Sequence, residues 1–373
     1  MRIAATMQRP LAWSMAKPIN YPSVYMSEIY MALFLLVAGF YVGGNIGAND
    51  AANCIGTMVG ARLLSFRKGA LLMALFVILG GTLQGHRVMK TLGKGIVITS
   101  PEMYEHVHEA ESPDDMQTYF PGGRLPDLAV LVALLSSGLL VTAATIARLP
   151  VSTSQAIVGG VAGVGVGVVG LQGTYFKVNV LFKILGCWVL SPLLTMILAY
   201  MMYTGLEILL SKTKALLWGK LLHYLVIASG CYVAFSLGAN DVGNAIGPLL
   251  NKYPDHGVPL ALLGGMAMAI GIFFFGRRVT DTVGKNISPL DLPGALAAQF
   301  TAAFGVHIFS MLAIPVSTSQ AIVGAVVGVG LTKGVRRISA RKITMIVAGW
   351  VLAPCSAALC AALLYRFLLA VIS

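Results

Sequence analysis

The sequence contains few charged residues. Asp, Glu, Lys and Arg make up 11% of its 373 residues, whereas they make up about 25% of an average soluble domain. Hydrophobic residues make up 57% of the chain, and the mean hydropathy is +0.82. This composition excludes a soluble globular protein.

Reactive cysteine and a cleavable leader are also lacking. The five cysteines lie in apolar surroundings, with no CxxC motif and no histidine at metal-ligand spacing, which predicts packing rather than a metal or redox site. No continuous apolar run precedes Ile29, so residues 1–27 are expected to be a loose tail and not a signal peptide. The net charge of +12 comes mostly from short segments between apolar stretches, where Lys and Arg set membrane orientation, and this excludes nucleic-acid binding.

Uncharged stretches long enough to span a membrane recur along the whole chain. A helix crosses the hydrocarbon core with roughly 20 apolar residues, so the longest stretches, 149–176 and 292–332, are expected to hold two crossings or re-entrant elements each. Many of the 42 glycines lie inside such stretches, where small residues let helices pack closely. The sequence therefore predicts an all-α integral protein of the lipid bilayer with about 10 to 12 membrane elements.

The two halves of the chain repeat the same blocks in the same order. GANDAANCIG at 47–56 returns as GANDVGNAIG at 238–247, displaced by 191 residues, and PVSTSQAIVG at 150–159 returns at 315–324, displaced by 165. The displacement falls because the first half carries an acidic insertion, which we predict to be a solvated loop at 101–127. Two further pairs keep this order: GHRVMKTLGKGI with GRRVTDTVGKNI from Gly85 and Gly276, and WVLSP with WVLAP from Trp188 and Trp350.

Basic residues follow different blocks in the two halves. Arg62, Arg67 and Lys68 follow the first GAND block, whereas Lys333 and Arg336 lie in a basic segment after the second STSQ block. Because Lys and Arg mark cytoplasmic loops, the halves have opposite orientations, as in transporters built from inverted repeats with broken helices. We expect both termini outside the cell, in a multi-pass protein of the plasma or inner membrane. The predicted units are an N-terminal tail (1–27), a first transmembrane repeat (28–210), a cytoplasmic linker (211–220) and a second transmembrane repeat (221–373).

Each GAND block places one carboxylate at membrane depth, Asp50 and Asp241. Such a group costs roughly 2.5–3.5 kcal/mol on the insertion scale, so a ligand must offset it. Helix opening at a neighbouring glycine and nearby amide oxygens would suit sodium, or a proton on the carboxylate. Helix capping is the alternative, but it does not explain two copies of opposite orientation. The amide groups are those of Asn49, Asn53, Asn240 and Asn244.

Each STSQ block combines a proline with three hydroxyls and an amide at an expected helix start. Free backbone N–H groups and the positive end of the helix dipole make such a start an anion site without Lys or Arg. Ordinary capping is the alternative for a single copy, whereas duplication beside GAND favours two starts facing one tetrahedral oxyanion. The predicted anion ligands are Ser152, Thr153, Ser154 and Gln155 in the first half and Ser317, Thr318, Ser319 and Gln320 in the second.

The basic side chains of the GHRV and GRRV blocks have two interpretations. Arg87, Lys94, Arg277, Arg278 and Lys285 could steer an anion electrostatically or pair with acidic groups across the repeat interface. Anchoring at the membrane interface is equally open, so they are not counted among the direct ligands.

The pairing of GANDAAN and GANDVGN with two copies of PVSTSQAIVG resembles the duplicated signature of the inorganic phosphate transporter (PiT) family, over about residues 28–365. The resemblance implies a secondary symporter that imports phosphate with sodium or protons and needs no cofactor beyond the coupling ion. It implies cation coordination, with sodium as the candidate metal, at Asp50, Asn53, Asp241 and Asn244, and phosphate contact at both Ser-Thr-Ser-Gln segments. The long central loop of many eukaryotic members is lacking, which suggests a compact prokaryotic form. A homodimer is left open.

Sulfate is the closest alternative cargo, because relatives of this family carry it and both anions are tetrahedral. Phosphate near neutral pH keeps a proton and can donate a hydrogen bond to a carboxylate, so Asp50 and Asp241 favour phosphate. A passive anion channel would not need buried carboxylates, and no His or Cys lies beside a plausible nucleophile in the repeated blocks, which argues against an enzyme. We expect alternating access around a site near the membrane midplane.

Overall fold

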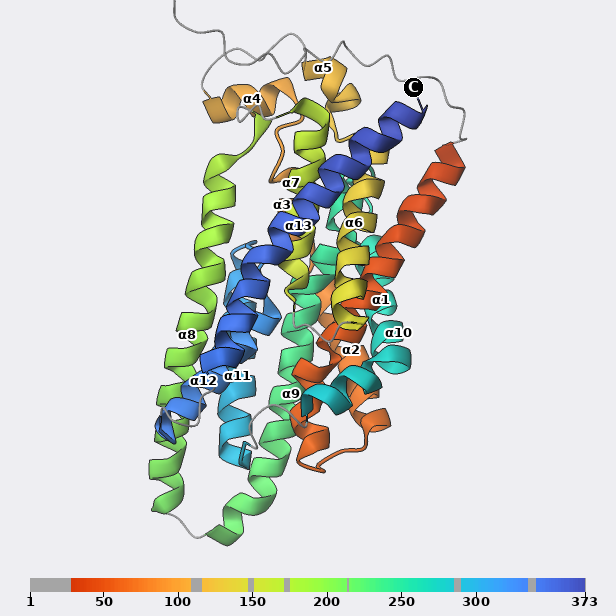
Figure 1. The fold of residues 1–373 in the computed structure, drawn as a ribbon. Coiled ribbons are helices and arrows are strands. Elements are labelled where there is room, and N and C mark those ends of the chain that lie inside the picture. The colour runs from red at the N-terminus through yellow and green to blue at the C-terminus, as the bar shows by residue number, and fades with distance from the viewer. Residues whose placement is uncertain are drawn as a thin grey trace, which may run out of the picture.

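A computed structural model describes residues 28–108, 116–146, 151–170, 175–212, 215–284, 290–334 and 340–372. The predicted tail 1–27 and Pro150 lie outside these residues. The described chain is a helical bundle (Figure 1), and its β structure is limited to one isolated bridge between Val97 and Phe176.

The helices follow the order of the repeated blocks. In the first half they are α1 (Glu28–Gly60), α2 (Phe66–Gln84), α3 (His86–Lys94), α4 (Pro101–His108), α5 (Met116–Tyr119), η1 (Pro121–Gly123), α6 (Asp127–Ile146), α7 (Thr153–Val169) and α8 (Val178–Ser211). In the second half they are α9 (Ala215–Ile246), η3 (Gly247–Asn251), α10 (Gly257–Gly284), α11 (Leu292–Met311), α12 (Thr318–Thr332) and α13 (Ala340–Ile372).

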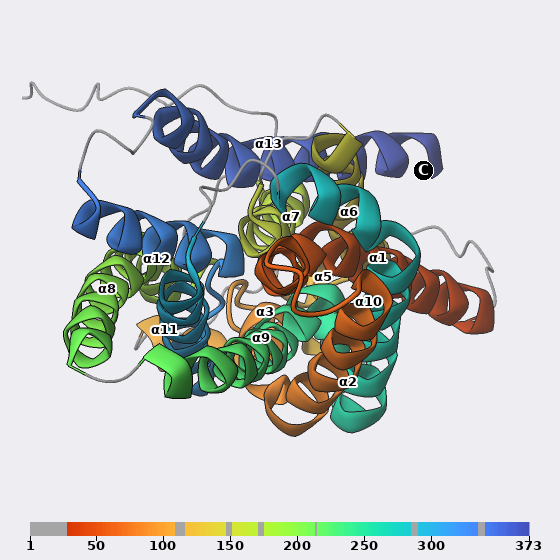
Figure 2. The same cartoon turned by 90° about the horizontal axis from the view of Figure 1, so that it is seen from below.

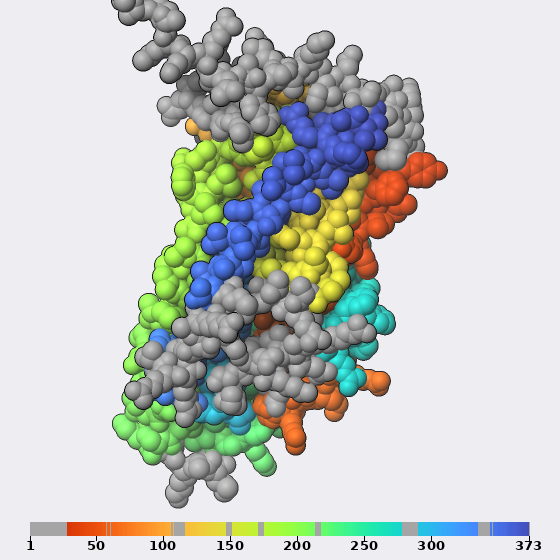
Figure 3. All heavy atoms as spheres, in the orientation of Figure 1, coloured from red at the N-terminus to blue at the C-terminus, as the bar shows by residue number. Residues whose placement is uncertain are grey.

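Among the described residues, 8 helices are long and apolar enough to cross a membrane, and α7 and α12 are shorter apolar helices. The all-α membrane architecture is thereby confirmed, at the lower end of the expected number of elements. Outer helices carry large apolar side chains on their exposed faces, which soluble proteins rarely do on this scale. On α13, which crosses the front of the molecule in Figure 3, Leu352, Leu359, Leu363 and Phe367 are each more than 60% exposed.

Equivalent helices of the two halves run in opposite directions (Figure 1). Helix α1 runs from the upper end of the molecule towards the lower end, and α9 runs upward. In the same way α8 descends and α13 rises, so that the beginning of α1 and the end of α13 lie at one end of the bundle. The prediction of two inverted repeats is confirmed.

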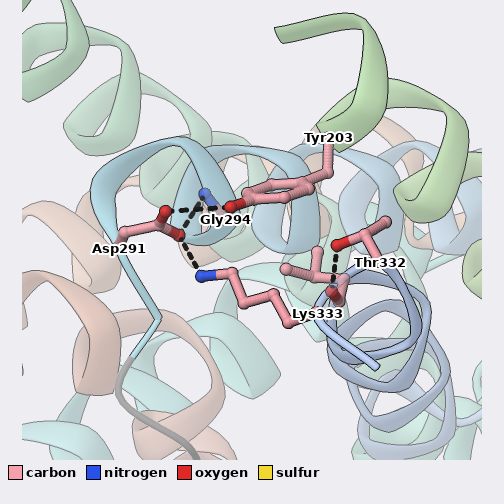
Figure 4. Close-up of polar contacts among 6 residues, drawn as sticks. Tyr203, Asp291, Gly294, Thr332 and Lys333 are labelled. Carbon is pink, nitrogen blue, oxygen red and sulfur yellow. Dashed lines mark hydrogen bonds and ion pairs between the residues drawn. The ribbon is translucent and has the colours of Figure 1, made fainter. Parts of the chain in front are cut away.

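The shorter helices α7 and α12 are the returning arms of two helical hairpins. The end of α12 lies beside the beginning of α11, because Lys333 Nζ is 2.9 Å from Asp291 Oδ1. Figure 4 shows this contact, to which Tyr203 of α8 and the backbone N–H of Gly294 also contribute through hydrogen bonds to Asp291. The STSQ segments therefore stand at the inner ends of the hairpins, within the bundle.

The two halves pack against each other through close backbone contacts, and these contacts occur at equivalent positions of the two repeats. In α1, a Cβ on Gly47 would lie 2.1 Å from the carbonyl oxygen of Met268 in α10. The same distance, 2.1 Å, separates a Cβ on Gly238 in α9 from the carbonyl oxygen of Val77 in α2. Both pairs are related by the 191-residue displacement, and no residue with a side chain fits at either glycine without a shift of the backbone.

The hairpin helices make an equivalent exchange with the last helix of the opposite half. A Cβ on Gly159 of α7 would lie 2.3 Å from the carbonyl oxygen of Pro354 in α13, and one on Gly324 of α12 would lie 2.2 Å from that of Pro192 in α8. Figure 2 shows α12 beside α8 and α13 crossing α7. Each helix that begins with an STSQ segment is therefore packed against the last helix of the opposite half.

The acidic insertion 101–127 is not the solvated loop that the sequence predicted. It forms α4, α5 and η1, and the ring of Tyr175 packs at centroid distances of 5.9 to 6.1 Å against those of Tyr104, Tyr119 and Phe120. The acidic composition suggested a solvated loop because the aromatic residues that pack are scattered among acidic ones. Residues 109–115 lie outside the described part.

The predicted linker 211–220 is also largely helical, since α8 ends at Ser211 and α9 begins at Ala215.

Candidate functional site

The carboxylate of the second repeat is fully buried near the C-terminal end of α9. Asp241 Oδ1 accepts a hydrogen bond of 3.0 Å from Asn240 Nδ2 and a shorter one from Asn244 Nδ2. Asn244 lies one helical turn after Asp241, which brings its amide back to the carboxylate. The GAND block is thus compact because its polar residues share one side of a helix.

Both STSQ segments reach this carboxylate. Ser154 Oγ of the first segment donates to Asp241 Oδ1 at 3.2 Å, and Thr318 Oγ1 of the second donates to Oδ2 at 2.7 Å. The amide of Asn244 also donates to Ser154 Oγ at 2.7 Å. The predicted cation and anion residues therefore form one continuous polar cluster instead of two separate sites.

The carboxylate of the first repeat has fewer partners. Asp50 Oδ1 accepts from Asn53 Nδ2 at 2.9 Å, from Asn49 Nδ2 at 3.4 Å and from Ser319 Oγ at 3.4 Å. Its second oxygen, Oδ2, is buried and has no hydrogen-bond partner. Ser319 comes from the second half, so each carboxylate is completed by a serine of the opposite repeat.

The two clusters are related by the repeat, but they are not equally closed. Thr318 binds Asp241 Oδ2, whereas the equivalent oxygen of Asp50 has no partner. Asn240, Asn244 and Ser154 are buried, whereas their counterparts beside Asp50 are partly exposed. The structure thus holds one tightly packed and one looser copy of the same arrangement.

The helix starts of α7 and α12 meet beside these carboxylates. Ser152 and Ser317 cap their helices, accepting from the backbone N–H of Gln155 and Gln320 at 3.3 and 3.2 Å. Ser154 Oγ also lies 2.7 Å from the carbonyl oxygen of Val316, the residue just before the second cap, so its one hydroxyl proton is shared between this carbonyl and Asp241. The remaining N–H groups of each first turn have no intrahelical acceptor, as at any helix start.

Several buried oxygen atoms of the cluster have no donor facing them. All of them are acceptor oxygens of carboxylate or amide groups, so they cannot satisfy one another. An unpartnered buried acceptor costs about 1–3 kcal/mol, and more when it is charged, so this set of atoms favours a positively charged ligand. The atoms are Asp50 Oδ2, Asn244 Oδ1, Gln155 Oε1 and Gln320 Oε1.

Sequence reasoning missed the backbone of Val316. Its carbonyl accepts from Asn240 Nδ2 at 2.6 Å, and its N–H donates to Asn240 Oδ1 at 3.2 Å. A main-chain partner gives no residue-type signal in a sequence.

A second polar layer was also missed, although the repeat displacement could have revealed it. Tyr41 OH lies 2.6 Å from Thr142 Oγ1, and the aligned pair in the second half, Tyr232 and His307, has a hydroxyl–Nδ1 distance of 2.8 Å. These pairs join the GAND helices to the first arms of the hairpins, and they position the clusters without belonging to them.

Inverted repeats, half-length helices that meet inside the bundle and buried carboxylates at that meeting point together define a membrane transporter fold. A family model described as the phosphate transporter family matches residues 46–222 and 217–361, which together make up most of the chain. The chain belongs to this family, in agreement with the resemblance seen in the sequence.

Individual relatives are similar to this chain over nearly its whole length. A protein of Methanocaldococcus jannaschii, provisionally assigned as a phosphate permease, is 29% identical over 88% of this chain and 94% of its own. A Thermococcus kodakarensis protein with the same assignment is 28% identical, over 91% of this chain and 98% of its own. A solved structure described as the sodium-dependent phosphate transporter superposes with a TM-score of 0.77 at 26% identity, covering 91% of this chain and 99% of that one.

Proposed function

We propose that this member of the family imports inorganic phosphate by symport with sodium, through alternating access around the cluster of Asp50, Asp241 and the two STSQ segments. The observation that carries the proposal is the exchange of serines: Ser319 binds Asp50, and Ser154 binds Asp241. A cation on either carboxylate would therefore reorganise the anion segment of the opposite repeat, which is the coupling that a symporter requires.

Sodium suits the unpartnered oxygens better than a proton does. A hard cation takes carboxylate, amide and hydroxyl oxygens as ligands, and these are the groups around Asp50. Amide oxygens such as Gln155 Oε1 do not take up protons at physiological pH, so protonation would leave them unsatisfied. The sodium dependence named for the similar solved structure supports the same choice.

Phosphate would bind at the paired helix starts of α7 and α12. The first-turn N–H groups and the positive ends of both helix dipoles favour an anion there. Ser154, Thr318 and Ser319 donate to carboxylates in this structure, and sodium bound to those carboxylates would free their hydroxyl protons for phosphate. Phosphate is preferred over sulfate because its remaining proton can be donated to a carboxylate.

The membrane orientation follows from the basic loops. Arg62 lies in the turn between α1 and α2, Arg67 and Lys68 lie in the first turn of α2, and Lys333 directly follows α12. These helix ends are opposite to the beginning of α1 and the end of α13 (Figure 1). Under the positive-inside rule this end faces the cytoplasm and both termini face outward, in the cell membrane. The structure, with a tightly packed Asp241 cluster and a looser Asp50 cluster, would then represent one state of the transport cycle. Exchanging the conformations of the two repeats would give the oppositely facing state.

Calorimetric titration of the purified protein with phosphate, in sodium chloride or choline chloride, tests the coupling. Linkage requires sodium to raise the phosphate affinity by the same factor by which phosphate raises the sodium affinity. We expect measurable phosphate binding only with sodium, and weak competition by sulfate. Equal phosphate affinity in the two salts would refute sodium coupling, and equal competition by sulfate would refute the proposed cargo.

A further inference from the structure

A basic groove outside the central cluster lies between α3 and the turn that follows α11. It has a volume of about 550 Å³, within the range of about 300–1,000 Å³ typical of small-molecule sites. Its basic side chains come from the GHRV block and from the residue before α8, and none of the described residues that line it is acidic. The titratable lining residues are His86, Arg87, Lys90, Lys94 and Lys177.

Among the described residues, no carboxylate pairs with the positive charges of this groove. Arg87 Nη1 donates to the carbonyl of Met311 at 2.8 Å, and Lys177 Nζ donates to the carbonyl of Lys94 at 3.3 Å. Lys90 and Lys94 are exposed, and neither forms an ion pair among the described residues. Partial burial and the neighbouring Lys90 and Arg87 lower the pKa of His86 below its ordinary value, as expected in a positive potential.

The floor of the groove is continuous with the central cluster. Thr91 Oγ1 donates to the carbonyl of Ala313 at 2.6 Å, and Ala313 has a φ of 61°, in the left-handed region that few residues other than glycine adopt. Val316, three residues further on, accepts the hydroxyl of Ser154, and Ser317 caps α12. The chain passes from a partly exposed turn into the buried site within these few residues.

We infer that this groove is a second, outer oxyanion site, in which Lys90, Lys94 and Lys177 hold phosphate by charge before it reaches the helix starts. The ligand chemistry is that of a phosphate group, which a free anion or the headgroup of an anionic lipid could supply. The inference rests on the proposed function for its role in transport, but the binding itself does not depend on transport. Lys90 aligns with Asp281 of the second repeat, so the sequence does not repeat this charge.

Lysine acylation read by mass spectrometry tests occupancy directly. The protein is placed in nanodiscs of phosphatidylcholine alone or with phosphatidylglycerol, and is labelled with or without inorganic phosphate. We expect phosphate to protect Lys90 and Lys94 in phosphatidylcholine and to leave the exposed Lys68, at the other end of the bundle, unprotected. Protection by phosphatidylglycerol alone, with no effect of free phosphate, would identify a lipid site and overturn the inference. Equal labelling under all conditions would also overturn it.

Transport kinetics give the second test. Removing two positive charges within about 10 Å of a phosphate should raise KM about three- to tenfold at low ionic strength, without changing the maximal rate. We therefore expect this shift for the double variant Lys90→Gln/Lys94→Gln, a similar one for Lys90→Asp, which changes the charge by the same two units, and none for Lys68→Gln. The differences should vanish above about 0.5 M salt. If the variants keep the wild-type KM and the normal sodium dependence, the inferred phosphate site in the groove is wrong, but the proposed function is not affected. If uptake by the wild type does not depend on sodium, the proposed function is refuted, whereas the labelling result still stands.

Discussion

The variant Asp50→Asn separates a cation ligand from a structural cap. Asparagine can keep its oxygen in the place of Oδ1, where Asn53 and Ser319 donate, and can put its NH₂ group where Oδ2 now has no partner. The hydrogen bonds seen in the structure therefore survive the change. What is lost is the negative charge and one cation-binding oxygen.

The expected effect on sodium binding is large. Removing one member of a buried charge pair costs about 3–5 kcal/mol. At about 1.4 kcal/mol per factor of ten, the sodium affinity should fall by about two to four orders of magnitude. Thermal stability of the sodium-free protein should be unchanged or slightly higher, because an unpaired buried charge has been removed.

The assay is the initial rate of labelled phosphate uptake into proteoliposomes as a function of sodium, with choline keeping the ionic strength constant. Asp127→Asn, which removes a carboxylate that pairs with Lys252 outside the cluster, is the matched control. We expect Asp50→Asn to show no saturation by sodium and the control to saturate like the wild type. A wild-type sodium curve for Asp50→Asn would show that the carboxylate is only a helix cap and would refute the reasoning.

Three further variants test the packing and the polar contacts. Thr318→Val leaves a buried carboxylate oxygen without its donor and should destabilise the protein by about 1–3 kcal/mol in thermal melts, whereas Thr318→Ser should restore most of the loss; equal stability of all three proteins would contradict the contact. Gly238→Ala places a methyl group against a backbone carbonyl and should lower the free energy of unfolding by about 1–3 kcal/mol. Gly186→Ala, where the added methyl group has no atom within 4 Å, should leave the stability unchanged or raise it slightly. Burial raises the pKa of Asp291, but hydrogen bonds from Lys333 and a tyrosine outweigh this and hold that pKa below its ordinary value. Its stabilisation should therefore be complete above about pH 4 and lost below it, and Lys333→Gln should weaken that dependence; an identical acid transition in the variant would count against the pair.

Much of the architecture was predictable because membrane spans and repeats leave strong signals. Long uncharged stretches gave the spans, and the displaced GAND and STSQ blocks indicated the duplication. Loop charge predicted the inversion that Figure 1 shows. The insertion at 101–127 was mispredicted, because its aromatic residues pack around Tyr175, which is 55 positions away from Phe120, the nearest of these partners in the sequence.

The site was predictable in its members but not in its connections. Local spacing placed Asn53 near Asp50 and Asn244 near Asp241, because residues three apart share a side of a helix. No local rule pairs Ser319 with Asp50, since that contact depends on how the second repeat packs on the first. The unequal closure of the two clusters is likewise a tertiary property, because the blocks that form them are nearly identical in sequence. Direct roles in sodium and phosphate binding stay predictions.

The most direct test of the central claim is whether a sodium gradient alone drives phosphate uphill. Proteoliposomes with equal phosphate on both sides, a tenfold inward sodium gradient and a clamped membrane potential should accumulate labelled phosphate above the external concentration. Each coupled sodium supplies about 1.4 kcal/mol, enough for up to about tenfold accumulation. The accumulation should collapse when an ionophore dissipates the gradient. Equilibration to equal concentrations, at a rate that sodium does not change, would contradict the account.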